Sequence, residues 1–335
     1  MTTISPDVNT AAGLLRLGNM FCDAKALLTA VDLDLFGALA DGPATEAELK
    51  DRLNLNGRGL SDFLHLLVAL GLIVRQNGTF ANSPGANAYL VRGKQSYIGG
   101  FLLRSNHNLY PAWGRLSEAL RSGEPQAAGD FQQVLRNPAI LRQFIGMMDA
   151  LTQQLAPELI KDFDFSAYGS VLDVGGCRGN MVGRLVTAYP NLRGHVLDLP
   201  ELEPFFDEHM ATMGLAESVD FHPGSFFERT LPAADIVLLG HVLHDWDARE
   251  REQLVRKAFE AVNPGGALLV YDRMLDDDPD HVENLVISLD MLLVTEGGAE
   301  YPVSELVSFA TAAGCANTTQ QSLGDYDTLV VCRRP

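Results

Sequence analysis

Two histidines follow a short apolar run, and they offer the clearest acid–base chemistry in the chain. Residues 235–239 are Asp-Ile-Val-Leu-Leu, and Gly240, His241 and His244 come soon after them. Such a run is typical of a strand buried in a parallel sheet, and ligands bind where those strands end. Because histidine exchanges a proton near neutral pH, we expect His244 to act as a general base at that edge.

A glycine-rich turn and a later acid predict a site for a nucleoside. Residues 170–174 form another expected strand that runs into Gly175 and Gly176, and Asp198 ends the strand after it. Glycine lets the backbone approach a ligand closely, and an acid in this place can accept hydrogen bonds from ribose hydroxyls. The turn lacks the G-x-G-x-x-G spacing of dinucleotide sites. A mononucleoside such as S-adenosylmethionine therefore fits better than NAD.

Alternating strands and helices must position these residues. This alternation from residue 170 onward predicts a doubly wound, mostly parallel, seven-stranded Rossmann-like sheet. The glycine turn, Asp198, His244 and Asp272 would all lie at the carboxyl ends of its strands. We expect strands at 170–174, 193–198, 218–222, 234–239, 266–272, 316–321 and 327–333, and helices near 180–189, 201–213, 249–262, 283–294 and 303–313.

The first part of the chain has the pattern of a winged-helix module. An amphipathic helix is expected at 10–31, and a later helix at 58–70 precedes a hairpin that turns at Asn77-Gly78. Residues 57–81 contain only two arginines and no basic stripe, which argues against DNA binding and against a DNA-binding ligand sensor. We therefore expect a helical dimerisation domain over 1–155 and a catalytic domain over 156–335. The excess apolar surface of the first helix would form the homodimer interface through Leu14, Leu17, Leu28 and Val31.

Composition narrows the partners further. The 335-residue chain carries a formal net charge of −18, which disfavours nucleic acid and anionic lipid and favours a neutral aromatic molecule or a cationic cofactor. Its apolar runs are too short for a membrane span. The four cysteines are scattered without a CxxC pair, so we expect reduced thiols, no metal site and a cytoplasmic location. The acidic run at 276–278 is expected to be a solvated loop.

These motifs, in this order, resemble a known enzyme family. The most specific element is Val-Leu-His-Asp-Trp-Asp at 242–247. From about Leu14 to Val331 the chain is similar to the S-adenosylmethionine-dependent O-methyltransferases, which include plant caffeate and acetylserotonin enzymes and bacterial polyketide enzymes. The resemblance implies methyl transfer from S-adenosylmethionine to an aromatic hydroxyl of a small metabolite, such as a polyketide or related natural product. It also implies a homodimer.

The resemblance assigns roles to individual residues. His244 would be the catalytic base, supported by the acids Asp272 and Glu300. The cofactor would be held by Asp173, Gly175, Gly176, Arg178, Asp198, Leu199, Ser225, Phe226 and Gly240. The acceptor pocket would include Met148, His241, Trp246, Asp290 and Met291.

Four positions depart from the family pattern. Cys177 and Arg178 replace small residues of the glycine turn, Ser225 replaces an aspartate beside the adenine, and Gly240 replaces a lysine or arginine. Arg178 could meet the carboxylate of the cofactor or block its site. Some relatives with this fold perform decarboxylation, hydroxylation or pericyclic reactions. A methyltransferase-like enzyme with a structural or absent cofactor is therefore the alternative hypothesis.

Overall fold

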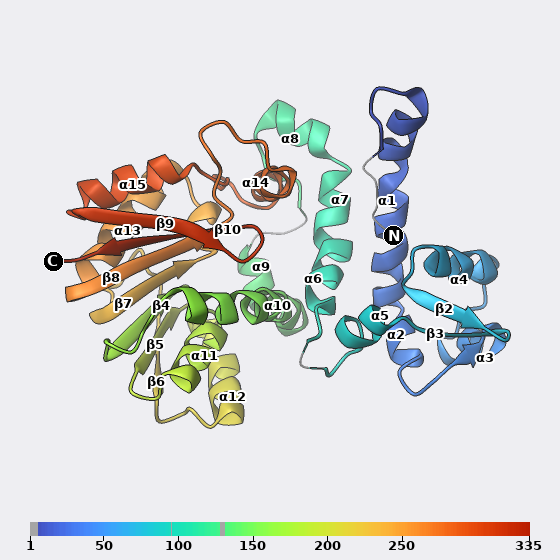
Figure 1. The fold of residues 1–335 in the computed structure, drawn as a ribbon, viewed down its shortest axis with the longest axis horizontal. Helices are drawn as coiled ribbons and strands as arrows, with labels where there is room; N and C mark the ends of the chain where they lie inside the picture. The colour runs from blue at the N-terminus through green and yellow to red at the C-terminus, as the bar shows by residue number, and fades with distance from the viewer. Residues whose placement is uncertain (1–5, 95, 128–130) are drawn as a thin grey trace. The chain divides into compact units, whose positions relative to one another are not determined.

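The chain divides into two compact units that meet in sequence at Tyr110 and Pro111 (Figure 1). The computed structural model describes residues 6–94, 96–127 and 131–335. The boundary expected between residues 155 and 156 falls inside helix α10 (Pro138–Asp162). The second half of α10 contributes Leu155 and Leu159 to a core of the second unit. A helical pattern that runs past a domain boundary does not show where the boundary lies.

The first unit is helical with one small sheet. Its elements are α1 (Ala11–Asp32), α2 (Leu35–Ala38), β1 (Ala44–Thr45), α3 (Glu46–Arg52), α4 (Leu60–Ala69), β2 (Ile73–Gln76), β3 (Thr79–Asn82), α5 (Pro84–Tyr89), α6 (Gly99–Arg104) and a π-helical turn (Ser105–Leu109). The strands lie in the order β1-β3-β2. Asn77 and Gly78 both have positive φ, at 51° and 80°, as the expected tight hairpin between β2 and β3 requires.

Helix α1 places its apolar residues on two different surfaces. Val31 is buried in the core of the first unit and Leu28 is also buried, so their expected role as exposed interface residues is wrong. Leu14 and Leu17 are 56% and 49% exposed, as an interface role requires, and Phe21 joins them at 55%. The periodicity of a helix cannot separate these groups, because its C-terminal half packs on its own unit and its N-terminal half does not.

The second unit contains the expected seven-stranded sheet. Strands β4 to β8 are parallel, and β10 is antiparallel to both β8 and β9, in the order β6-β5-β4-β7-β8-β10-β9. This confirms the Rossmann-like fold class. The strands are β4 (Ser170–Val174), β5 (Arg193–Asp198), β6 (Val219–Pro223), β7 (Ala234–Gly240), β8 (Val262–Asp272), β9 (Asn317–Leu323) and β10 (Asp327–Arg333).

Helices cover both faces of this sheet (Figure 1). Alternate residues of β8 point to opposite faces, so Leu268 and Val270 join the core with α13 and α15, whereas Ala267 and Leu269 join the core with α10, α11 and α12. The chain order reverses between β4 and β7, and this is where such sheets bind ligands. The helices are α8 (Leu116–Ser122), α9 (Phe131–Arg136), α11 (Asn180–Ala188), α12 (Glu203–Met213), α13 (Ala248–Ala261), α14 (Val282–Val294) and α15 (Val303–Ala312), with α7 (Tyr110–Trp113) at the junction of the units.

The expectation of four reduced cysteines is wrong for one pair. Cys315 and Cys332 form a disulfide with their Cα atoms 6.0 Å apart. Cys315 lies just before β9 and Cys332 lies in β10, and the antiparallel pairing of these strands brings the two residues together. Cys22 and Cys177 are free thiols. Among the residues that the structure describes, no helix is both long and apolar enough to cross a membrane.

Candidate active site

His244 lies where β7 leaves the sheet. The strand ends at Gly240, His241 takes a left-handed backbone conformation with φ of 53°, and a short 3₁₀ turn, Leu243–Asp245, carries His244. The neighbouring Leu243 is fully buried and anchors the turn in the core. This local geometry turns the His244 side chain inward, so that it is only 9% exposed.

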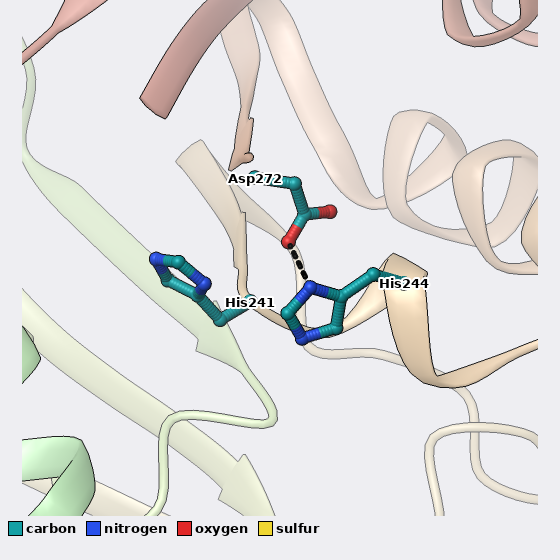
Figure 2. Close-up of side chains that lie close together, drawn as sticks. All are labelled: His241, His244 and Asp272. Carbon is teal, nitrogen blue, oxygen red and sulfur yellow. Dashed lines mark ion pairs between the residues drawn. The ribbon is translucent and has the colours of Figure 1, made fainter. Parts of the chain in front are cut away.

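Two buried carboxyl groups face the same nitrogen of His244. Nδ1 lies 2.7 Å from Oε1 of Glu300 and 3.5 Å from Oδ1 of Asp272, and both acid side chains are fully buried. Figure 2 shows the contact with Asp272, which reaches His244 from the end of β8. The hydroxyl of Tyr301 donates a 2.6 Å hydrogen bond to Oδ2 of Asp272. The structure therefore brings together the three residues that the resemblance assigns to catalysis.

The two acids change the proton affinity of His244. Burial alone would lower its pKa, but the carboxylates of Glu300 and Asp272 outweigh burial and raise the pKa to about 10. Burial raises the pKa of Asp272 to about 7, against the opposing effect of His244. His244 is therefore held mainly as the imidazolium at neutral pH, and its neutral form, which is the form that accepts a proton, increases as the pH rises toward 10.

A second histidine–acid pair lies beside the first. The Nε2 atom of His241 is 3.0 Å from Oδ1 of Asp327, the first residue of β10, and Nε of Arg273 is 3.8 Å from Oδ2 of the same acid. The rings of His241 and His244 are 5.5 Å apart between centroids. No local sequence pattern indicates Asp327, because only the pairing of β10 with β8 brings it to this edge.

The residues of this cluster are of types that can bind a metal ion. His241, His244 and Asp272 each offer one ligand atom, and these atoms lie within 4.8 Å of one another (Figure 2). The 2.7 Å separation of Nδ1 of His244 from Oε1 of Glu300 is that of a charge-assisted hydrogen bond, so Nδ1 does not bind a metal ion while it donates its proton to Glu300. We interpret the cluster as one that handles protons.

The glycine turn leaves little room for side chains. A Cβ atom on Gly175, whose φ is 79°, would lie 2.7 Å from Val242, and one on Gly176 would lie 2.8 Å from the carboxyl group of Asp173. Asp198 accepts 2.7 Å hydrogen bonds from the backbone N–H groups of Cys177 and Leu199. The structure thus places Asp198 directly against the turn.

The two acids of this region have raised pKa values. Burial raises the pKa of Asp173 to about 7, and the nearby charge of Asp198 adds to this effect. Burial also raises the pKa of Asp198 to about 6, although its two backbone hydrogen bonds oppose the shift. Carboxyl groups in this situation gain most from a ligand that brings hydrogen-bond donors or positive charge.

Arg178 lines a hollow beside the turn. Its guanidinium binds Asp149 of α10, with Nη2 2.6 Å from Oδ2, and Asn180 donates to the same acid at 2.8 Å. The guanidinium therefore does not extend freely into solvent, and its side chain is 29% exposed. The hollow is lined by Met148, Asp149, Asp173, Gly175, Gly176, Arg178, Gly240, His241 and Tyr271, among others.

Tyr271 explains why position 240 is a glycine. A Cβ atom on Gly240 would lie 2.0 Å from Cζ of the Tyr271 ring, so a lysine or arginine at position 240 would collide with it. Tyr271 lies on β8, pairs with Gly240 in register, and reaches the hollow beside the glycine turn. No sequence signal indicates a role for Tyr271. It is the penultimate residue of a buried strand, where an aromatic residue is expected to belong to the hydrophobic core.

The loop expected beside the adenine is held by its own contacts. Oγ of Ser225 accepts a 3.2 Å hydrogen bond from the N–H of Phe227, and Lys257 of α13 donates to the carbonyls of Phe226 and Phe227 at 2.6 and 2.8 Å. The ring of Trp246 packs edge-on against both phenylalanines at 5.7 and 4.7 Å. The structure therefore groups Trp246 with this loop, although the resemblance assigns it to the acceptor pocket.

The remaining pocket residues lie in two places. Met148 lines the hollow beside the glycine turn. Asp290, on α14, is buried and accepts a 2.5 Å hydrogen bond from Nε1 of Trp113, and the half-buried Met291 follows it on the same helix. Among the described residues, neither of these two lines the hollow that contains Met148 and His241.

Comparison with known proteins gives consistent matches over both units. Residues 113–316 match the O-methyltransferase domain, and residues 15–92 match the O-methyltransferase dimerisation domain. The chain is 42% identical over 326 residues to the tetracenomycin polyketide synthesis 8-O-methyl transferase TcmO of Streptomyces glaucescens, covering 96% of each chain. It is 38% identical to the N,N-dimethyltransferase OxyT of Streptomyces rimosus, covering 100% of this chain and 99% of OxyT.

A solved structure has the same architecture. The human N-acetylserotonin methyltransferase, determined in complex with S-adenosylmethionine, aligns with a TM-score of 0.89 at 25% identity. The alignment covers 98% of this chain and 99% of the human chain. The likeness therefore extends over the whole length of both proteins.

Proposed function

The chain belongs to the S-adenosylmethionine-dependent O-methyltransferase family, and from this premise we propose that it methylates a phenolic hydroxyl of a polyketide or related aromatic natural product, with His244 as the base. The observation that carries the proposal is the pairing of His244 with Glu300 and Asp272 at the edge of the sheet, next to the glycine turn. The 42% identity to TcmO, a polyketide O-methyl transferase, supports the substrate class. The alternative of a lost methyl transfer is not favoured.

The residues at the glycine turn fit S-adenosylmethionine. Bound, this cofactor supplies a methyl group already activated by a sulfonium. Asp198 would accept hydrogen bonds from the ribose hydroxyls, and Gly175 and Gly176 line the hollow, so the backbone of the turn could approach the ligand closely. Asp173 is buried beside them with a raised pKa, and it would gain from the positive charge of the ligand.

His244 would remove the main obstacle to the reaction. A phenol with a pKa near ~10 is about three units from ionisation at neutral pH, which costs about 4 kcal/mol. The phenol proton would pass to Nε2 of His244, while Glu300 accepts a hydrogen bond from Nδ1 and stabilises the imidazolium. Bound S-adenosylmethionine would supply the methyl group, and His244 would hold the phenol oxygen as the nucleophile that receives it. The imidazole gains the proton that the phenol loses, so this transfer is balanced.

A binding and turnover experiment tests this function. We expect calorimetry to detect binding of S-adenosylhomocysteine, and mass spectrometry to detect the gain of one methyl group on phenolic polyketides supplied with S-adenosylmethionine. Binding without methylation of any phenol would contradict the proposed acceptor and keep the cofactor. Absence of any binding would contradict the proposal at its first step.

The acceptor atom is open to one specific competitor. OxyT, similar to this chain over its whole length, is named as an N,N-dimethyltransferase. A second candidate is therefore methylation of an aromatic or aliphatic amine. Matched acceptors that carry either a hydroxyl or an amino group on the same ring separate the two, and we expect the hydroxyl compound to give the larger kcat/KM.

The first unit supplies the dimer. The chain forms a homodimer, as its match to the dimerisation domain of the family indicates, and the exposed Leu14, Leu17 and Phe21 of α1 give a surface suited to this contact. We predict that deletion of residues 1–31 causes aggregation and loss of activity, because it removes both this surface and the buried Leu28 and Val31.

A point variant separates assembly from folding. We expect Leu17→Glu to dissociate the dimer without loss of secondary structure, whereas Leu66→Glu on α4, with an exposed leucine of similar kind, leaves the dimer intact. Light scattering measures the mass. A monodisperse, active truncation of the size of a monomer would contradict the role of α1.

A further inference from the structure

His241 is held in place by groups that leave one of its nitrogens available. Nε2 faces Asp327 at 3.0 Å, and Asp327 is buried at the start of β10 next to Arg273. Among the described residues no hydrogen bond reaches the other ring nitrogen, Nδ1, and the 3.0 Å contact of Nε2 with Asp327 is an ion pair that lacks the geometry of a hydrogen bond. The side chain is only 8% exposed, yet it lines the hollow beside the glycine turn. His241 therefore borders both the hollow, which His244 does not line, and the ring of His244, whose centroid lies 5.5 Å away.

The available nitrogen is a hydrogen-bond donor when the ring is protonated. Burial alone would lower the pKa of His241, but the adjacent carboxylate of Asp327 raises it above the ordinary value. In the protonated ring both nitrogens carry a hydrogen, so Nδ1 can donate to an oxygen. A phenolate or carbonyl oxygen is the matching acceptor, and a hydrogen bond from a charged donor is stronger than one between neutral groups.

The second histidine restricts where that oxygen lies. The rings of His241 and His244 are 5.5 Å apart and tilted by 59°. A hydroxyl at His244 and a neighbouring oxygen of the same molecule lie about 2.7 Å apart when they share a hydrogen bond. Two oxygens about 2.7 Å apart can therefore each accept or donate one hydrogen bond, one with His244 and the other with Nδ1 of His241. Ortho or peri oxygen atoms on an aromatic ring have this arrangement.

We propose that His241 binds a second oxygen next to the hydroxyl that is methylated, so that the preferred acceptors are phenols flanked by an ortho or peri carbonyl or hydroxyl group. This rests on the proposed function, with His244 at the hydroxyl. Asp327 is a positioning residue, because it acts on the acceptor only through His241. Most other phenols of the same size would lose the His241 contact and keep the contact with His244.

An isomeric pair of acceptors tests the proposal. In 1-hydroxyanthraquinone the hydroxyl is flanked by a carbonyl, whereas in 2-hydroxyanthraquinone it is not, and the two compounds have the same formula. We expect His241→Phe, which keeps a planar ring and removes the donor, to lower kcat/KM for the flanked isomer by about 10- to 100-fold more than for the other. Comparing variant with wild type cancels the intrinsic reactivity of each isomer. Affinity of each isomer for the complex with S-adenosylhomocysteine is measured in parallel and should show the same difference.

Two further variants keep the test decisive. Asp327→Asn should reduce the same selectivity by a smaller factor, and Asp327→Glu should restore part of it, which a purely structural role would not produce. His107→Asn is the matched control, because His107 contacts Asp32 at 2.8 Å in an exposed histidine–acid pair of the first unit. It should leave the selectivity unchanged.

The outcomes separate the inference from the proposed function. Equal losses for both isomers in His241→Phe and Asp327→Asn would overturn the inference, because His241 would then act on the reacting hydroxyl or on the cofactor. Failure of the wild type to bind S-adenosylhomocysteine or to methylate either isomer would count instead against the proposed function. If His241→Phe no longer binds S-adenosylhomocysteine, the decision passes to Asp327→Asn and Asp327→Glu.

Discussion

Two pairs of buried carboxyl groups lie at the carboxyl edge of the same sheet, and they have different partners. Glu300 and Asp272 face His244, whereas Asp173 and Asp198 face the glycine turn. Burial raises the pKa of Asp272 and of Asp173 to about 7. At His244 the chain supplies the compensating cation itself. At the glycine turn, the part of the chain that the structure describes supplies two backbone N–H groups, both to Asp198.

This difference separates two roles for the same residue type. The acids at His244 act on the proton that would pass from the substrate to the imidazole, so changes there should affect turnover and its pH dependence. The acids at the turn gain their partner only with a ligand, so changes there should affect binding. Variants of His244 and of the acids in the two pairs test this division.

Removal of the base should have the largest effect. We expect His244→Ala to lower kcat by about 10²–10⁴-fold and to leave the affinity for S-adenosylhomocysteine nearly unchanged. The loss should shrink as the pH approaches the pKa of the phenol, because the substrate then ionises without help. Stopped assays over a range of pH measure this, with His107→Ala as control. Wild-type turnover at neutral pH would show that alignment of the substrates is sufficient.

Loss of the ribose acid should affect binding instead. We predict that Asp198→Ala weakens S-adenosylhomocysteine by about 1–3 kcal/mol, because two hydrogen bonds to a carboxylate are lost, while kcat at saturating cofactor changes less. Calorimetry gives the affinity. Asp220→Ala on the adjacent strand β6 removes an acid that pairs with Arg193 and should not change it. A fall in kcat without a fall in affinity would erase the distinction between the two acid pairs.

The pH profile should move when Glu300 loses its charge. Glu300 raises the pKa of His244, so Glu300→Gln should lower that pKa and shift the rising limb of kcat against pH toward lower pH. The plateau should fall by about tenfold or more, because the imidazolium is less well stabilised. Asp272→Asn should shift the limb less, since its contact is 3.5 Å rather than 2.7 Å. A limb that does not move would assign the titration to the substrate alone.

The smallest effect is expected at the adenine loop. Ser225→Asp should tighten S-adenosylhomocysteine by a factor of about 2–10, because a charged acceptor makes a stronger hydrogen bond to an amino group. The new side chain can also accept from the N–H of Phe227, as Ser225 does. Calorimetry with adenosine alone shows whether the gain in affinity comes from the adenosine part of the ligand. Weaker binding would indicate that position 225 faces another group.

Much of this molecule follows from local sequence patterns. The apolar run before His244 predicts β7, the glycine turn after residue 174 predicts a close backbone approach, and Asn77-Gly78 predicts the hairpin. Each depends on residues next to one another in the chain. The same is true of the motif at 242–247, and the family could therefore be recognised before any packing was known.

Other features depend on packing that no local pattern contains. Asp327 comes next to His241 because β10 pairs antiparallel with β8. The pairing of β10 with β9 brings Cys315 and Cys332 together. In the sequence, Gly240 stands where the family has a lysine or arginine. In the structure, the ring of Tyr271 occupies the place that a Cβ atom at position 240 would take. Leu28 and Val31 continue the apolar pattern of Leu14 and Leu17, yet only tertiary packing buries the first two.

Local sequence patterns predict the sheet, the glycine turn and the place of His244 after β7, because hydrophobic periodicity and backbone conformational preferences act over a few residues. Tertiary structure decided which acids share a proton with His244, which residue holds His241, and which leucines of α1 remain exposed. These depend on contacts between segments far apart in the chain, and burial at those contacts sets the pKa of each group.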